Sequence, residues 1–451
     1  MDREYILKHI EDFTAQQLFE CISQGIVTID ELRGTGNLDA SIRKAIIALQ
    51  TARETEDDNA WNNARYTEQG CRDYLTKYPA GKHVAEAKQK IDEMEEQRNR
   101  NRAAKQGILN NIKKNPNSYN PTQILDFLNN GTITQSDLTG YCEIPQSAID
   151  NLGNINTPTL TLGNTPSAIP PGYTEVYFWG GRGSGKTCAL GAILQMSEKM
   201  GYLDIATGSG YNYAYQLKNI FSDDGHANDY LPAPTPTESN QYLPFTLKKE
   251  NEKHSRSISL IELSGEIFEC FFYHNAGQQM PSQSHLDSFN SLKNFLNSNN
   301  HKIHFFFIDY DKENKPNDRG LKQSDYLAAA STYFKNNTVF GKSTAAIYVV
   351  LTKSDLLTDD NGNKLPVHER VEFAKKHLNE NNYKAFINTL KDNCKTYNIN
   401  AGRLTVEPFS LGKVYFREIC NFEGSAAENI VEILMDRIAP DKKSILDVFN
   451  K

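Results

Sequence analysis

A run of glycines that ends in a lysine and a threonine is the most chemically specific feature of this 451-residue chain. An apolar segment ending at Trp179 leads into Gly180-Gly181-Arg182-Gly183-Ser184-Gly185-Lys186-Thr187-Cys188, and a helical pattern follows. Glycines let backbone N–H groups approach a phosphate without an obstructing Cβ, and a helix N-terminus favours anions. Lys186 would then bridge the β- and γ-phosphates of a nucleotide, and the Thr187 hydroxyl would bind Mg²⁺. The run, called the P-loop below, predicts a nucleotide-phosphate site.

Four residues after a second apolar segment indicate which base is bound. Thr352-Lys353-Ser354-Asp355 follows the apolar stretch 345–351, and it resembles the [NT]KxD base-recognition motif of the Ras-like GTPases. A fixed carboxylate at Asp355 can accept two hydrogen bonds from the N–H groups of guanine, and the Lys353 stem can pack on the base face. Adenine presents the opposite donor pattern at that edge. The sequence therefore predicts GTP and GDP as ligands, with a P-loop ATPase as the disfavoured alternative.

Two more motifs occur in the same order along the chain. Glu262-Leu263-Ser264-Gly265 ends one apolar strand, and Ser410-Leu411 follows another. With these, residues 175 to about 440 resemble the Ras-like, TRAFAC-type P-loop GTPases. The resemblance implies that Glu262 holds Mg²⁺ through water, that the Gly265 N–H contacts the γ-phosphate, and that the Ser410-Leu411 loop contacts the base. It also implies an α/β fold with a mostly parallel six-stranded sheet flanked by helices.

Three positions depart from the family pattern. The acid is Glu262 rather than aspartate, and the position after Gly265, often a water-positioning glutamine, is Glu266. An ionised glutamate cannot donate to the γ-phosphate as an amide can, so slow unaided hydrolysis is expected. Arg182 replaces a small residue in the P-loop, where it acts as a built-in arginine finger or points to solvent.

Further candidates lie between these motifs. The resemblance places a threonine that closes on Mg²⁺ in segment 230–239, where Thr237 is favoured over Thr235. Asp309 and Asp311 end an apolar strand and are either functional acids or polar caps. The expected catalytic residues are thus Lys186, Glu266, Arg182 and Thr237, and the expected metal ligands are Thr187, Thr237 and Glu262.

Alternation of strand and helix signals after residue 172 predicts an α/β domain with a largely parallel sheet. The six expected strands are Glu175–Trp179, Leu243–Lys248, Ser257–Leu263, Lys302–Tyr310, Ala345–Leu351 and Leu404–Phe409.

The first 152 residues contain an internal repeat. The segment 17–46 (copy one) aligns without gaps to the segment 123–152 (copy two). In each copy an apolar helix stops at a glycine, Gly25 or Gly131, and a threonine then starts a second helix. We expect a helical hairpin from each copy, within an all-α region that precedes the GTPase domain.

The segment between the copies resembles one tetratricopeptide-like hairpin, with two helices broken at 79–81. A turn-rich stretch after copy two reads as a linker. The expected domains are copy one at 1–50, the tetratricopeptide-like hairpin at 51–102, copy two at 103–152, the linker at 153–172 and the GTPase domain at 173–451.

Composition bounds the remaining possibilities. The net charge of −7 argues against general attraction to nucleic acid, so no nucleic-acid partner is expected. No apolar run approaches the about 18 residues of a membrane span. Seven scattered cysteines without metal-ligand spacing indicate reduced thiols and a cytoplasmic location.

These features predict a guanine-nucleotide switch whose N-terminal helical region binds a protein partner, with homo-oligomers as an option. Resemblance to prokaryotic multidomain GTPases suggests signalling or defence. A guanine-nucleotide-binding scaffold with little hydrolysis is the alternative that Glu262 and Glu266 favour.

Overall fold

The computed structural model describes residues 2–153, 160–163, 166, 168–208, 210–222, 229–232, 240–313, 315–316, 320–337, 339–380 and 382–439. The chain forms two compact units, Met1–Ile108 and Leu109–Lys451, called unit 1 and unit 2 below. No helix among the described residues is long and apolar enough to cross a membrane.

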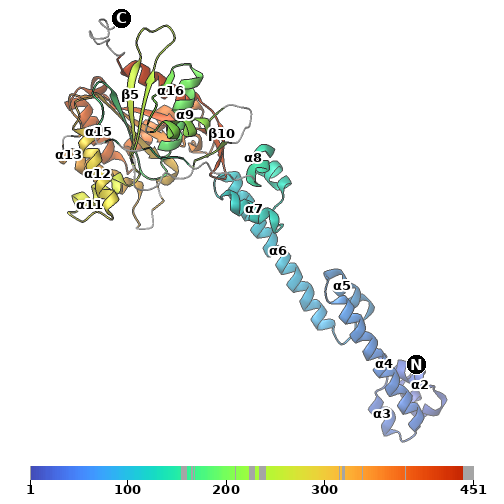
Figure 1. The fold of residues 1–451 in the computed structure, drawn as a ribbon. Coiled ribbons are helices and arrows are strands. Elements are labelled where there is room, and N and C mark those ends of the chain that lie inside the picture. The colour runs from blue at the N-terminus through green and yellow to red at the C-terminus, as the bar shows by residue number, and fades with distance from the viewer. Residues whose placement is uncertain are drawn as a thin grey trace, which may run out of the picture. The chain divides into compact units, whose positions relative to one another are not determined.

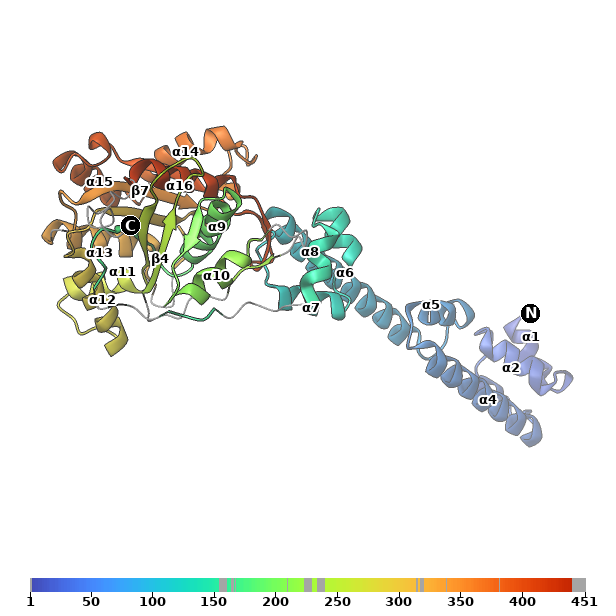
Figure 2. The same ribbon diagram turned by 45° about the horizontal axis from the view of Figure 1, so that its top comes forward.

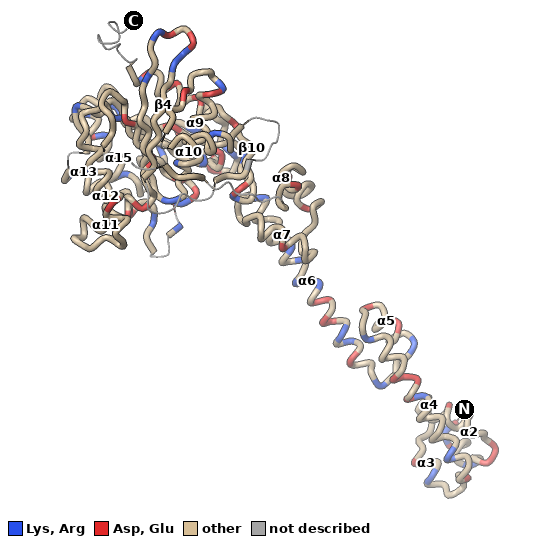
Figure 3. The backbone as a smooth tube through the Cα atoms, in the orientation of Figure 1, with Lys and Arg blue, Asp and Glu red and all other residues tan. Residues whose placement is uncertain are grey.

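Unit 1 is helical. Its elements are α1 (Arg3–Lys8), the 3₁₀ turn η1 (Ile10–Asp12), α2 (Ala15–Ser23), α3 (Ile29–Gly34), α4 (Ala40–Ala64), α5 (Glu68–Lys77) and the first part of α6 (Val84–Lys114). The expected domain boundaries after residues 50 and 102 fall inside α4 and α6, both of which continue unbroken there. Residues 96–104 of α6 are exposed, and Figure 3 shows both charge signs along this helix, as expected of a solvated helical stretch.

Two small cores hold unit 1 together. Copy one buries Leu18, Val27, Leu32 and Ile46, each no more than 1% exposed. In the segment that follows copy one, α4, α5 and α6 pack around Trp61 and Tyr74. The main-chain N–H of Lys82 donates a hydrogen bond to the Asp57 carboxylate at 2.7 Å. The chain between α5 and α6 spans the expected break at 79–81.

Unit 2 begins with copy two. Its elements are α7 (Pro121–Asn129), the π-helical turn η2 (Asp137–Tyr141), α8 (Gln146–Asp150) and the 3₁₀ turn η3 (Asn151–Gly153). Beyond it, the described part of the expected linker contacts the rest of the unit: Ile169 is buried in the sheet domain, and the Gly172 N–H donates to Asn300 at 3.1 Å.

The sheet of unit 2 has seven strands in the order β2-β4-β5-β1-β6-β7-β8. These are β1 (Thr174–Trp179), β2 (Leu203–Ile205), β4 (Gln241–Leu247), β5 (Arg256–Glu262), β6 (Lys302–Asp309), β7 (Thr344–Thr352) and β8 (Thr405–Phe409). Strands β5, β1, β6, β7 and β8 are parallel neighbours, whereas β4 pairs antiparallel with both β5 and β2.

The expectation of six strands was wrong by one. All six expected strands are present, but β2 was missed because Leu203–Ile205 is too short to show a period. A second sheet was also missed: β3 (Asp229–Tyr230), β10 (Ile419–Phe422) and β9 (Gly412–Tyr415) pair antiparallel. Its strands of two to four residues are too short to give a period-two signal.

Helices cover both faces of the large sheet (Figures 1 and 2). One face carries α9 (Lys186–Lys199), α10 (Tyr211–Asn219) and α16 (Ser425–Arg437); the other carries α11 (Ile267–Asn275), α12 (Gln283–Leu296), α13 (Gln323–Asn336), α14 (Val367–Glu380) and α15 (Lys384–Thr396). The side chains of β1 alternate between the two faces. Val176 and Phe178 pack against the helices of the first face, and Tyr177 and Trp179 pack against those of the second. This burial on both faces fixes β1 at the centre and the P-loop at its end.

Candidate functional site

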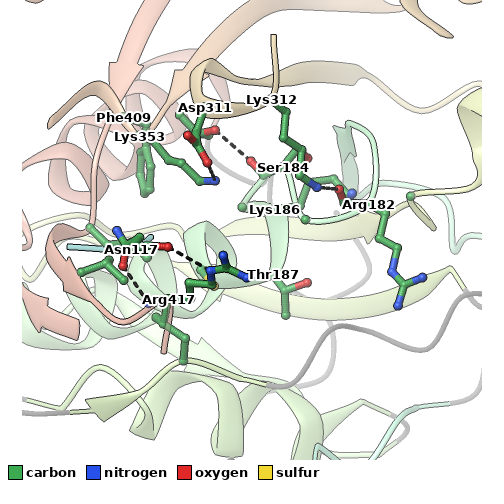
Figure 4. A pocket seen from close by; sticks show the side chains of 18 of the residues that line it. Asn117, Arg182, Ser184, Lys186, Thr187, Asp311, Lys312, Lys353, Phe409 and Arg417 are labelled. Atoms are coloured by element: carbon green, nitrogen blue, oxygen red, sulfur yellow. Dashed lines mark hydrogen bonds and ion pairs between the residues drawn. The ribbon is translucent and has the colours of Figure 1, made fainter. Parts of the chain in front are cut away.

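The carboxyl ends of the parallel strands meet at one edge of the sheet, where ligands of open α/β sheets bind. Each strand delivers a residue there: the P-loop follows β1, Glu262 ends β5, Asp309 ends β6, Thr352 ends β7 and Ser410 follows β8. A pocket of about 900 Å³ opens at this edge (Figure 4). A site of this size is typical for a small organic ligand such as a nucleotide.

Most residues expected in the site line this one pocket. They are Arg182, Gly183, Ser184, Gly185, Lys186, Thr187, Cys188, Glu262, Gly265, Glu266, Thr352, Lys353, Asp355, Ser410 and Leu411. Gly180 and Gly181 are not in its lining but accept hydrogen bonds from Lys186. Thr235 and Thr237 lie outside the described residues.

Two glycines allow the chain to close around the pocket. Gly185 precedes α9 with φ of +89°, a left-handed conformation that glycine adopts without strain. Gly265 approaches the P-loop so closely that a Cβ there would lie 2.5 Å from the Arg182 main-chain nitrogen. The two loops therefore meet, so that the Gly265 N–H and the P-loop N–H groups can face one ligand.

Lys186 is held inside the P-loop. Its ammonium donates to the main-chain oxygens of Gly180 at 2.7 Å and Gly181 at 3.2 Å. Burial lowers its pKa to about 8, although Glu262 and Glu266 nearby favour the charged form. A bound phosphate would further favour the charged form of this buried ammonium and would raise its pKa again.

Thr187 and Glu262 form an oxygen pair at the start of α9. The Thr187 hydroxyl donates to the Glu262 carboxylate, which also accepts from the Tyr213 hydroxyl at 2.8 Å. Burial raises the pKa of Glu262, and the two hydroxyl contacts oppose that shift. Mg²⁺ takes oxygen ligands, commonly one or two protein groups with phosphates and waters, so the pair fits such an ion. Tyr213, which sequence reasoning missed, fixes the carboxylate.

The opposite end of the pocket is built around Asp355. The Ser410 hydroxyl donates to its carboxylate at 2.9 Å, which orients that group. The Thr352 hydroxyl donates to the main-chain oxygen of Ser184 at 3.0 Å. The 352–355 segment is thereby tied directly to the P-loop, so a ligand held at one can reach the other.

Asp309 and Asp311 are both caps and ion-pair partners. The Asp311 N–H donates to Asp309 at 3.0 Å, which starts the 3₁₀ turn η4 (Tyr310–Lys312). Lys353 reaches the same two carboxylates at 2.9 and 3.5 Å. Burial disfavours the charge of Lys353, but the two carboxylates more than offset this and raise its pKa. The pair therefore orients the lysine expected to pack on the base.

Glu266 and Arg182 were expected to influence hydrolysis, but their side chains are not directed at a common point of the pocket. The Glu266 carboxylate accepts a hydrogen bond from the Ser264 hydroxyl at 2.7 Å. Arg182 is exposed, and Figure 4 shows its side chain extending away from Lys186. In this structure neither group completes the phosphate end of the pocket.

Lys312 lines the phosphate end of the pocket and was not among the expected site residues. Its ammonium donates to the main-chain oxygen of Arg182 at 2.5 Å, above the P-loop. Burial lowers its pKa. Its position three residues after the end of β6 was the available signal, since polar residues there reach the same sheet edge.

Other lining residues were not among the expected site residues, although Leu231 and Pro232 belong to segment 230–239, which was expected to close on Mg²⁺. Asn115 and Asn117 precede copy two, Leu231 and Pro232 follow β3, and Arg417 and Glu418 lie between β9 and β10. No sequence signal ties these segments together. They meet only because the small sheet brings them to the pocket.

No family model matches the chain, and no curated protein matches it. Solved structures with similarity include the S. cerevisiae Ski7 GTPase-like domain bound to GTP, at 17% identity over 59% of this chain and 51% of that chain with a TM-score of 0.28. Others are Methanosarcina barkeri Roco2 RocCORdC bound to GDP (13%, 62% and 53%, TM-score 0.26) and a putative nucleolar GTP-binding protein 1 of Plasmodium falciparum (13%, 59% and 94%, TM-score 0.23). The chain spans about half the length of the first two. At these TM-scores the likeness carries no argument about this site.

Proposed function

We propose that this chain binds GTP and GDP at the pocket and hydrolyses GTP slowly when unaided. The observation that carries the proposal is the junction of two recognition elements: the oriented Asp355 carboxylate and the P-loop, joined by Thr352. One reads a base and the other holds phosphates. Thr187 and Glu262 would hold Mg²⁺, which stabilises charge on the phosphates.

The phosphate end explains why hydrolysis would be slow. Glu266 is hydrogen-bonded to Ser264 and cannot donate an N–H to a γ-phosphate, and Arg182 is exposed. Lys312 supplies a second cation next to Lys186, placed to contact a phosphate oxygen. A partner that reorients Arg182 or supplies a donor would raise the rate.

A scaffold that binds guanine nucleotide without turnover is the second candidate, and the Glu266 contact favours it. Single-turnover phosphate release from the isolated chain separates the two. A slow but nucleotide-dependent rate supports the GTPase, whereas no release above the spontaneous background supports the scaffold.

The wider role is part of the same proposal. The GTP state would order the segments around the pocket and change what the N-terminal helical repeats can bind, which makes the chain a switch for a protein partner or for a second copy of itself. All seven cysteines are free thiols, which suits a cytoplasmic location. The resemblance to prokaryotic multidomain GTPases suggests a role in signalling or defence.

The decisive experiment is Asp355→Asn with a panel of nucleotides. The new amide places N–H donors towards the guanine donors, which leaves buried polar groups unpaired at a cost of about 1–3 kcal/mol each. GTP affinity should fall at least about tenfold. Xanthine has a carbonyl where guanine has the amine, so affinity for xanthosine triphosphate should rise.

Asp359→Asn is the matched control. Asp359 lies outside the pocket, where its carboxylate accepts main-chain bonds from Asn361 and Asn363 at 2.9 and 2.7 Å. It should leave both affinities unchanged. If Asp355→Asn lowers both affinities or neither, or if the parent prefers ATP, Asp355 does not read guanine and the ATPase alternative returns.

A further inference from the structure

The loop before copy two is joined to the turn between β9 and β10. The Phe416 N–H donates to the main-chain oxygen of Pro116 at 3.0 Å, and the Arg417 N–H donates to Asn117 Oδ1 at 2.7 Å. The Arg417 guanidinium donates to the main-chain oxygens of Asn117 at 2.9 Å and Ser118 at 3.0 Å. These four hydrogen bonds join positions about 300 residues apart in the sequence.

The turn that receives the loop is the hairpin turn between β9 and β10. Phe416 and Arg417 have φ of +54° and +69°, the two left-handed residues that a type I′ turn between antiparallel strands requires. The Glu418 N–H closes the turn on the Tyr415 main-chain oxygen at 3.3 Å. The contacts to 116–118 add to this turn, and they hold the Arg417 guanidinium against the loop before copy two.

Both partners also line the nucleotide pocket. Asn117 and Arg417 belong to its wall, and Figure 4 shows them linked at the pocket. The Arg417 side chain is exposed and that of Asn117 is half-buried, so their remaining N–H donors are accessible to an acceptor on a bound ligand.

The position of these donors along the ligand follows from the chain. Strand β9 runs from Gly412, directly after the Ser410-Leu411 loop, to Tyr415, directly before the turn. That loop belongs to the end of the pocket where Asp355 lies. Leu231, whose N–H donates to the Glu418 main-chain oxygen at 2.7 Å, closes the same wall. The hairpin that carries Arg417 therefore begins at the end of the pocket where Asp355 lies.

We infer that the loop before copy two is part of the nucleotide site, with Arg417 and Asn117 donating hydrogen bonds to the ribose or α-phosphate of the bound nucleotide. The inference rests on the proposed function. It gives a role to Asn117, a pocket residue from outside the region that resembles the GTPase family. It also links the pocket to α6, because α6 ends at Lys114, directly before the loop.

The test measures GDP and GTP affinity for the full chain and for Arg417→Ala, Asn117→Ala and Arg370→Ala. Arg370 is the matched control because its guanidinium also donates to a main-chain oxygen, that of Leu365 at 3.1 Å, outside the pocket. Losing a charged hydrogen bond should weaken binding about tenfold for Arg417→Ala, with a smaller loss for Asn117→Ala. Both losses should be equal for GDP and GTP, since the two nucleotides share the nucleoside half.

The other outcomes are distinct. Parent affinity in Arg417→Ala overturns the inference and leaves the proposed function standing. A loss confined to GTP overturns the assignment to the nucleoside half. If the parent binds no guanine nucleotide, the proposed function and the inference fall together.

Hydrogen exchange of the unaltered chain guards against a variant that does not fold. GDP should slow amide exchange in residues 109–120 and 412–420, and should leave residues 15–34 of unit 1 unchanged. Exchange in 109–120 that is the same with and without GDP, at a concentration that saturates the pocket, overturns the inference.

Discussion

Copy one and copy two begin alike. Helices α2 and α7 have nine residues each, and each starts with a reciprocal capping box, Thr14 with Gln17 and Asn120 with Gln123. Each helix then ends before a left-handed glycine, Gly25 with φ of +74° and Gly131 with φ of +72°. The shared sequence therefore produces the same first half in both copies.

The second halves differ in structure and in surroundings. Copy one continues into the α-helix α3, whereas the equivalent part of copy two is the π-helical turn η2. Copy one completes a core within unit 1, while copy two contacts the sheet domain: the Tyr230 hydroxyl donates to the Asn151 main-chain oxygen. Copy one thus closes on itself, whereas copy two packs on the sheet domain directly after the loop whose residues Asn115 and Asn117 line the pocket. A repeated sequence determines the hairpin but not what the hairpin packs against.

The largest expected effect comes from removing residues 1–108 with copy one, and then residues 1–159 with both copies. A chain that starts at residue 109 should keep its nucleotide affinity within about twofold, because unit 2 retains every residue of the pocket. A chain that starts at residue 160 loses Asn115, Asn117 and the contacts that hold the 416–417 turn, so binding should be lost. Fluorescent-nucleotide titration with circular dichroism measures both. Equal binding by the two truncated chains would show that copy two is not needed at the pocket.

A matched pair of core substitutions sharpens the same comparison. Leu18 and Ile124 occupy equivalent positions and are both fully buried. Changing either to alanine should lower the free energy of unfolding of its own unit by about 2–5 kcal/mol. Only Ile124→Ala should also weaken GDP binding, because it loosens the module that supports Asn117. A similar loss of affinity in Leu18→Ala would mean that copy one also supports the pocket.

The two copies show which features of the fold can be predicted from the sequence and which cannot. The helix starts at Thr28 and Thr134 were predictable because capping is local chemistry, set within four residues of chain. The P-loop and the strands before Glu262 and Thr352 were predictable for the same reason. A parallel sheet brings the ends of such strands to one edge whatever the rest of the chain does.

The wall of the pocket was not predictable from the sequence. Asn117 and Arg417 are separated by 300 positions, and they are polar residues without periodicity. The small sheet that brings them together has strands of two to four residues, below the length at which alternation can be recognised. Likewise Tyr213 and Lys312 reach the site through tertiary packing, and no motif marks either residue.

A pH titration separates the contribution of copy two from that of the phosphate end. Burial lowers the pKa of Lys186 to about 8, and a bound phosphate raises it again, so binding takes up a proton above that pH. Nucleotide affinity should therefore fall as the pH rises from about 7 to about 9, by at most about tenfold per pH unit. Arg417→Ala should give a parallel, lower curve, because its hydrogen bonds to the nucleotide do not involve the Lys186 ammonium. Curves that converge at high pH would place Arg417 beside Lys186, at the β- and γ-phosphates.

The smallest expected effect tests the two capping threonines. Thr28 accepts from the Glu31 N–H and Thr134 from the Asp137 N–H, both at 3.2 Å. Alanine at either position should cost about 1 kcal/mol of unfolding free energy in its own unit.

Calorimetry with and without saturating GDP distinguishes the two variants, because a ligand stabilises only the unit that binds it. GDP should raise the melting transition that Thr134→Ala lowers, and should leave the transition that Thr28→Ala lowers where it is. Two transitions that respond equally to GDP would mean that both copies belong to one nucleotide-binding unit. A transition lowered by Thr134→Ala that ignores GDP would instead separate copy two from the pocket that Asn117 and Arg417 line.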